Sequence, residues 1–359
     1  MTRWARGAGA VAIGAWCAAV ALHASRPAPV AGGLPERLAD TGLYADGGHE
    51  VIDPRNRTFS PQYPLWSDGL RKSRWIYLPP GSTIDASDPH AWRFPAGTRL
   101  WKEFRAGERK VETRMLWKAS EAEGWVYASY LWNEAGTEAR LADERGVPGV
   151  VEVGPARRHG IPSRNDCAAC HGNPDRGGPL GFNALQLSTD RDPHALHGET
   201  LDPGMLTLTH LVGERLLAPA RRDLVERPPR IVTASPATRA VLGYLAANCG
   251  VCHNGRGEIA ALGPTIRYRE LLEDGEAVAK RLVGQSTRWQ LPGRPEGSTV
   301  LVEPGAPDQS ALLARMRSRS PSTQMPPLGT VLRDQQAVDA ITMWISGLKR
   351  APTGPDLLR

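Results

Sequence analysis

Two copies of the pattern Cys-x-x-Cys-His restrict what this chain can become more than any other feature of its sequence. The first copy occupies residues 167–171 and the second occupies residues 249–253. The chain has five cysteines, and the fifth, Cys17, lies in an apolar run near the N-terminus. Every other cysteine belongs to one of the two pairs, so none remains for a disulfide between distant segments.

Several kinds of chemistry use paired cysteines, and the histidine that follows each pair separates them. A disulfide within a pair would close a very short loop, and a redox-active dithiol or a single Cys₄ zinc site would leave both histidines without a role. Covalent haem attachment uses all six residues, because each thiol binds a vinyl group and the histidine supplies an axial nitrogen. The sequence therefore predicts two haem c groups, held by Cys167, Cys170 and His171 and by Cys249, Cys252 and His253.

The residues around the second motif predict two helices and one further iron ligand. Residues 236–248 have the apolar spacing of a helix that ends at Cys249, and residues 333–348 have that of a terminal helix. Gly243 would give room for the two helices to cross closely. After His253 the chain has no histidine and only three methionines, of which Met325 lies in a loop with two prolines. We expect Met325 to be the sixth ligand of the second haem.

With these features, residues 233–351 resemble a class I cytochrome c domain. The likeness is carried by the Cys-Gly-Val-Cys-His motif, the Met325-Pro-Pro loop and a terminal helix that contains Trp344. It implies that Pro264 turns the chain past His253, and that a nearby carbonyl accepts the Nδ1–H of this histidine. Pro179 would do the same for His171.

The first haem segment, residues 154–232, leaves the sixth ligand undecided. Pro162 and Gly160 leave no room for a long helix before Cys167, so we expect the motif to open a helix or turn. An open coordination position is one alternative. The others are side chains of ordinary kinds, each of which could equally be a core or surface residue: Met205, His210, His194, His197 and His159.

Residues 35–153 contain no cysteine and alternate with period two. Seven of the eleven tryptophans lie between Trp66 and Trp132, within short runs bounded by turn residues. This pattern predicts an antiparallel β domain, most simply a sandwich. The predicted fold class is therefore an α+β multidomain protein, with a β-sandwich-like domain followed by mainly α haem domains. We expect the tryptophans to fill a core and cover the first haem rather than to bind a sugar.

The N-terminus is typical of an export signal. Arg3 and Arg6 precede an uncharged apolar run over residues 7–22, with small residues at two cleavage positions. We expect removal of residues 1–24 and a periplasmic location, with an uncleaved membrane anchor as the alternative. No stable membrane span is expected after cleavage. The 44 basic and 38 acidic residues are scattered along the chain, which argues against nucleic acid as a partner.

The wider pattern resembles a family of bacterial dihaem c-type cytochromes. The likeness rests on residues 63–69 (YPLWSDG), 111–114 (VETR), 161–164 (IPSR) and 180–182 (LGF). It implies electron transfer between redox partner proteins that the sequence does not identify. The alternative is a dihaem redox enzyme of the peroxidase kind, in which the Met325 haem feeds an open first haem. The carrier accounts for the residues more simply, since no acid–base group stands out.

Overall fold

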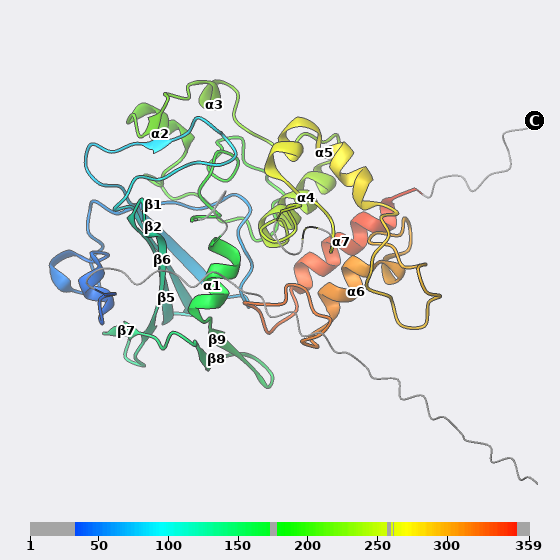
Figure 1. Cartoon of the computed structure of the whole chain (residues 1–359), viewed down its shortest axis with the longest axis horizontal. Coiled ribbons are helices and arrows are strands. Elements are labelled where there is room, and N and C mark those ends of the chain that lie inside the picture. The colour runs from blue at the N-terminus through cyan, green and yellow to red at the C-terminus, as the bar shows by residue number, and fades with distance from the viewer. Residues whose placement is uncertain (1–32, 173–177, 257–259, 261, 350–359) are drawn as a thin grey trace, which may run out of the picture.

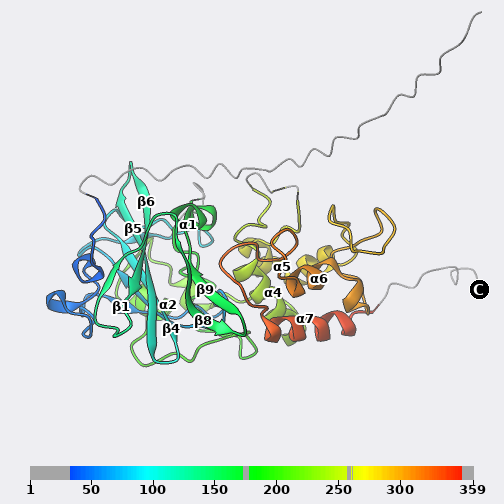
Figure 2. The ribbon, with the colours of Figure 1, turned by 90° about the horizontal axis from the view of Figure 1, so that it is seen from below.

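The computed structural model describes residues 33–172, 178–256, 260 and 262–349. The predicted export signal at residues 1–24 lies outside the described residues. Figures 1 and 2 show two neighbouring halves, a sheet with short helices on one side and a group of longer helices on the other. Among the described helices, none is both long and apolar enough to pass through a bilayer.

Antiparallel strands form the largest regular element of the chain. Six of them pair in the order β1-β2-β4-β5-β6-β7, and two smaller sheets pair β8 with β9 and β10 with β3. The strands are β1 (Arg57–Thr58), β2 (Arg71–Tyr77), β3 (Ile84–Asp85), β4 (Arg99–Ala106), β5 (Arg109–Ser120), β6 (Gly124–Trp132), β7 (Ala139–Leu141), β8 (Val147–Gly154), β9 (Arg157–Ile161) and β10 (Leu217–Ala218).

Helices are short in the middle of the chain and longer toward its end. The α-helices are α1 (Arg164–His171), α2 (Leu208–Gly213), α3 (Asp223–Glu226), α4 (Pro236–Asn248), α5 (Tyr268–Leu282), α6 (Ala311–Arg317) and α7 (Gln335–Gly347). The short 3₁₀ helices are η1 (Leu38–Thr41), η2 (Ala45–Gly47) and η3 (Pro307–Gln309).

One face of the six-stranded sheet is an aromatic core. Trp75, Trp101, Met115 and Ala128 lie opposite one another on β2, β4, β5 and β6 and are all buried. The segment before β1 covers them with Leu38, Leu43 and Tyr44. The expectation that tryptophans fill a core is confirmed here. This core lies on the face away from α1, so its rings do not cover the first motif. Trp125, on the other face, lies against Gly178, whose carbonyl contacts His171.

The other face of the sheet has an apolar part and a charged part, which follow one another along the strands. Toward one end, Ile76, Leu100 and Leu116 pack on a second apolar core around Phe182. In the next row, Arg74, Lys102 and Arg114 lie directly opposite one another on three adjacent strands. Like charges that face each other across strands destabilise a sheet. The row therefore marks a place where the fold accepts an unfavourable local arrangement.

The helices predicted for residues 236–248 and 333–348 are confirmed as α4 and α7. Ser235 accepts from the N–H of Thr238 at the start of α4, and Pro236 occupies its first position. The indole N–H of Trp344 in α7 donates to the hydroxyl of Thr238 at 3.2 Å. Both helices bury their apolar sides in one core with α5 and α6.

The predicted fold class is wrong. The alternating strands pair into a single large sheet rather than the two facing sheets of a sandwich, because chain segments and loops cover both of its faces. The described residues between 154 and 232 are mostly irregular, with helices of only 4 to 8 residues. Glycine and proline interrupt this segment too often for longer helices. The antiparallel sheet, and not a set of mainly α haem domains, dominates the molecule.

The loop at residues 63–69 joins the two halves. The ring of Tyr63 takes the space above Gly243, where an added Cβ would come within 2.1 Å of it. The expected use of Gly243 for crossing α7 is therefore wrong, since the space belongs to Tyr63. Farther along the loop, the N–H of Trp66 donates to Asn248 at 2.8 Å. Asn248 directly precedes Cys249, so the loop anchors the second motif to the sheet.

Candidate functional site

The first motif forms the second half of helix α1. Ser163 caps this helix: its hydroxyl accepts from the N–H of Asp166, whose carboxylate accepts from the N–H of Ser163. Cys167 and Cys170 are three residues apart, so both thiols lie on the same side of the helix. The motif forms the end of α1. The expectation that it would open a helix or turn is therefore wrong.

His171 is oriented by the segment that follows it. Its Nδ1 lies 2.7 Å from the carbonyl oxygen of Gly178, the residue before Pro179, so Nδ1 is the protonated nitrogen and Nε2 carries the lone pair. Its ring lies 5.9 Å from that of Tyr127 on β6. Burial lowers the pKa of His171 to about 4, and the nearby charges of Lys102 and Arg114 also lower it. The ring is therefore neutral at pH 7, as an iron ligand must be.

The second motif continues α4 as one further helical turn. The carbonyl of Cys249 accepts from the N–H groups of Cys252 and His253, at 3.1 and 2.8 Å. This turn places the thiols of Cys249 and Cys252 on one side, as in the first motif. The expected delivery of these cysteines at the end of α4 is confirmed.

His253 differs from His171 at Nδ1. This nitrogen is buried and has no hydrogen-bond partner among the described residues. Gly263, the residue before Pro264, lies against the ring so closely that an added Cβ would come within 2.6 Å of Nδ1. The two prolines thus occupy equivalent places, but the carbonyl contact is present only at His171. Burial, and then the charge of Arg315, lowers the pKa of His253.

The two motifs meet in space. The thiols of Cys170 and Cys252 are near enough to interact, which raises the pKa of the Cys170 thiol and lowers that of Cys252. Burial raises the pKa of the Cys167 thiol to about 11 and that of Cys249 to about 12. All four cysteines are free thiols and partly exposed. Segments that are 82 residues apart in the sequence therefore present their thiols side by side.

The residues present fit covalent haem better than the other uses of paired cysteines. No disulfide joins the four described cysteines, and no group of three or more potential metal ligands gathers among the residues that the structure describes. A Cys₄ zinc site would require all four thiols to converge. Each motif instead presents two thiols on one side of a turn, with a neutral imidazole beside them. At the second motif, the absence of a side chain at Gly263 leaves space for the ring of His253.

Met325 lies on the helical side of the molecule, close to the second motif. Its N–H donates to the carbonyl of Arg315, the residue whose charge acts on His253. Its side chain lines a small hollow with Met316, Tyr244 and Asn248. Met325 and His253 thus share Arg315 as a neighbour, although the described contacts do not join them directly.

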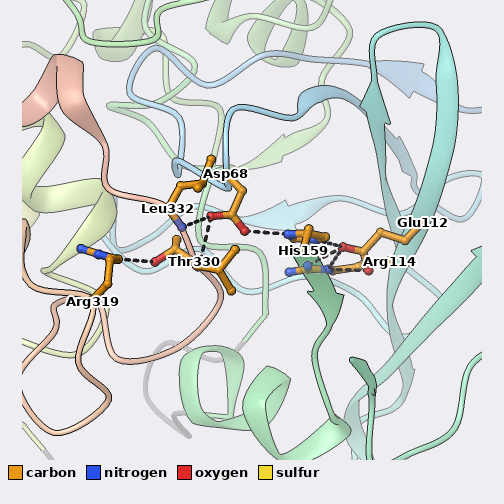
Figure 3. Close-up of polar contacts among 8 residues, drawn as sticks. Asp68, Glu112, Arg114, His159, Arg319, Thr330 and Leu332 are labelled. Atoms are coloured by element: carbon orange, nitrogen blue, oxygen red, sulfur yellow. Dashed lines mark hydrogen bonds and ion pairs between the residues drawn. The ribbon is translucent and has the colours of Figure 1, made fainter. Parts of the chain in front are cut away.

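A buried polar network that no sequence pattern predicts connects the sheet beneath the first motif with the segment after the Met325 loop (Figure 3). His159 lies between two carboxylates, with Nδ1 at 2.8 Å from Asp68 and Nε2 at 3.1 Å from Glu112. The other oxygen of Asp68 accepts from the backbone N–H groups of Val331 and Leu332. Arg114 donates to Glu112. Asp68, Glu112 and His159 are at most 4% exposed.

Basic and acidic groups alternate along this network. Burial acts to lower the pKa of His159, but its hydrogen bonds to Asp68 and Glu112 outweigh burial and leave the pKa raised. Burial acts to raise the pKa of Glu112, but the charge of Arg114 and the hydrogen bond from His159 leave it lowered. The raised pKa favours the protonated form of His159, which the neighbouring carboxylates stabilise in a place where an unpaired charge would be costly.

Most of the candidates for the sixth ligand of the first haem are engaged elsewhere. Both nitrogens of His159 are used in the network, and Nε2 of His197 lies 2.8 Å from Asp334. His210 contacts Thr207 at the start of α2 through Nδ1, and His194 is exposed. The N–H of Leu206, next to Met205, bonds to β1, whereas α1 contacts β6. Four strand spacings, roughly 19 Å, separate β1 from β6.

Lys102 lies in the row of basic residues between Arg74 and Arg114. No sequence pattern marked it as a candidate site residue. Arg74 pairs with Glu199 at 2.7 Å and Arg114 pairs with Glu112. Lys102 has no ion pair or hydrogen bond in the described part of the chain, although Glu112 is near enough to act on its charge. Its Nζ lies 5.1 Å from the centre of the Phe104 ring. Burial lowers the pKa of Lys102 well below its ordinary value, and Arg114, Arg74 and Lys72 lower it further.

Comparison with known proteins leaves the chain without a named relative. No protein-family profile matches it, and neither a curated protein nor a solved structure shows significant similarity to it. The two motifs and their surroundings are therefore the features that indicate a function.

Proposed function

We propose that this chain is an exported dihaem c-type cytochrome that transfers electrons through two covalently attached haems. Cys167, Cys170 and His171 would hold the first. Cys249, Cys252 and His253 would hold the second, with Met325 as its other axial ligand. Each bound haem would supply an iron that alternates between the ferric and ferrous states and so carries one electron.

The observation that supports this proposal most is the nearness of Cys170 and Cys252, whose thiols each shift the pKa of the other. Two independent haem modules would have no reason to bring their attachment thiols together. In this chain the loop at residues 63–69 fixes the helical half against the sheet, and the two motifs meet where the halves join. The attachment edges of the two porphyrins would then be neighbours, as a short electron relay between a donor and an acceptor protein requires.

The side chains around each motif support the same use. Both axial imidazoles are neutral, and His171 is held in one tautomer by the carbonyl of Gly178. The thioether of Met325 would favour the ferrous state of the second iron and raise its reduction potential. With both axial positions filled, an iron can change oxidation state without making or breaking a bond to a ligand.

Haem attachment is tested by producing the exported protein in cells that carry out cytochrome c maturation. We expect two haems per chain by pyridine haemochrome assay and by intact mass. The double variants Cys167→Ala/Cys170→Ala and Cys249→Ala/Cys252→Ala should each retain one. A colourless protein that contains zinc or a Cys170–Cys252 disulfide would contradict the proposal.

The ligand of the second iron is tested with Met325→Ala. We expect this variant to lose the absorption band between thioether and ferric iron while keeping both haems. Met343→Ala is the matched control, because Met343 is 70% exposed on α7. Survival of the band in Met325→Ala would assign it to another methionine.

A further inference from the structure

The sheet beneath the first motif carries an unexplained lysine. Lys102 lies in the middle of the row Arg74–Lys102–Arg114, where each neighbour repels it. Both arginines have carboxylate partners, and Lys102 has none among the described residues. A fold usually tolerates an unfavourable local arrangement of this kind at a functional site.

The position of Lys102 relative to the first motif suggests what the lysine does. Tyr127, which contacts the ring of His171, lies on the same face of the sheet as Lys102, in the next row of paired residues. Gly178, whose carbonyl oxygen lies 2.7 Å from Nδ1 of His171, lies against Trp125 on this same face. The lysine therefore faces the side chains that would hold the first haem.

Few atoms on this face of the sheet could donate a lone pair to an iron. Among the charged residues of the row, a guanidinium offers no lone pair to a metal, whereas a lysine amine offers one when it is neutral. Arg74 and Arg114 are thus excluded by chemistry as well as by their carboxylate partners. The histidine and methionine candidates of this segment are engaged, exposed or near the far edge of the sheet.

We propose that the amine of Lys102 is the sixth ligand of the first haem. This inference rests on the haem attachment proposed above. It gives the two irons different ligand pairs, with histidine and lysine at the first and histidine and methionine at the second. The chain would then fill both axial positions of both irons, so that each iron could transfer an electron without a change of ligand.

The experiment uses the full-length holoprotein and three variants. Lys102→Ala removes the amine, and Lys102→Arg keeps the positive charge but removes the donor atom. Lys72→Ala is the matched control, because Lys72 lies on the same face of the sheet and donates to the carbonyl of Leu65. Ferric-state electron paramagnetic resonance separates the two haems, since their ligand pairs differ.

We expect the wild type and Lys72→Ala to show two low-spin signals and slow cyanide binding. Lys102→Ala and Lys102→Arg should both lose the signal of the first haem and bind cyanide rapidly at one iron. Unchanged signals in both variants would overturn the assignment. A change in Lys102→Ala that Lys102→Arg restores would also overturn it, because charge alone would then suffice.

Two further measurements separate this result from other failures. The haem count of each variant shows whether a lost signal reflects altered ligation or a lost haem, and a count below two in the wild type would overturn the proposed function itself. Near-infrared magnetic circular dichroism of the unmodified protein supports the assignment if it detects an amine-ligated iron. It contradicts the assignment if it detects only thioether or two-histidine ligation.

Discussion

The first Cys-x-x-Cys-His motif lies over a charged sheet face, whereas the second ends an apolar helix. Around the first, Arg114, Glu112 and His159 balance their charges in a buried network. Around the second, α4, α5, α6 and α7 share one hydrophobic core. The same pentapeptide pattern is thus supported by hydrogen bonds and ion pairs in one place and by apolar packing in the other. The motif therefore specifies which residues would attach a haem, but not the surroundings in which that haem would lie.

The largest expected effect tests the polar side of this comparison. Asp68→Ala removes a buried carboxylate, which leaves His159 with one partner and frees two N–H groups at Val331 and Leu332. We expect the free energy of unfolding to fall by about 3–5 kcal/mol, measured by urea denaturation. Asp143→Ala, which removes an exposed ion pair with Arg145, should change little. Equal effects of the two variants would show that the network does not stabilise the fold.

A pair of glycine variants tests the two sites separately. An alanine at Gly178 would need a positive φ of 103° and would place its Cβ 2.4 Å from Trp125, and an alanine at Gly263 would collide with the ring of His253. We expect each to reduce the free energy of unfolding by about 1–3 kcal/mol. Each should also shift the resonance signal of its own haem alone. Gly213→Ala, with open space around it, is the control, and a shift of both signals by either variant would contradict separate sites.

A smaller effect is expected where the two halves join. Tyr63→Phe removes the hydrogen bond from the phenol to Asp192 at 3.1 Å but keeps the ring over Gly243. The free energy of unfolding should fall by about 1 kcal/mol. Tyr77→Phe is the control, since the hydroxyl of Tyr77 has no hydrogen-bond partner in the described part of the chain. A loss of one haem in Tyr63→Phe would contradict a purely local role for the hydroxyl.

The smallest expected effect is a pH dependence that comes from His159. Its pKa in the folded chain is raised above the ordinary value of 6.5, so its contribution to stability is fully present below 6.5 and is lost as the pH rises through the raised pKa. The advantage of the wild type over His159→Gln in urea denaturation should therefore shrink with increasing pH. An advantage that grows with pH would mean that His159 is neutral in the folded protein.

The parts of the fold that sequence predicts are those set by nearby residues. The helix at 236–248 follows from the spacing of Val241, Leu242 and Leu245, with Pro236 at its start, and the alternating runs with tryptophan became β2, β4, β5 and β6. The pairing of these strands into one sheet depends on which segments cover its faces. No local pattern of residues carries that information, so the sandwich was the wrong choice.

Prediction of the candidate site was limited in the same way. The four cysteines and the two histidines that follow them are legible because their chemistry fixes their spacing. Asp68, Glu112 and His159 are far apart in the sequence, and each alone is an ordinary charged or polar residue. Lys102 becomes notable only when sheet register places it between Arg74 and Arg114. Its signal is an unpaired charge, which a sequence alone does not reveal.

The nearness of Cys170 and Cys252 sets an order for assembly. In an oxidising compartment, two thiols that meet in the finished fold are free to couple to each other, which would take one sulfur away from each porphyrin. Once both sulfurs are thioethers, that coupling is no longer available. If the proposed function holds, the attachment enzymes would have to act before Cys170 and Cys252 meet, and the sheet would close against the helices only after attachment.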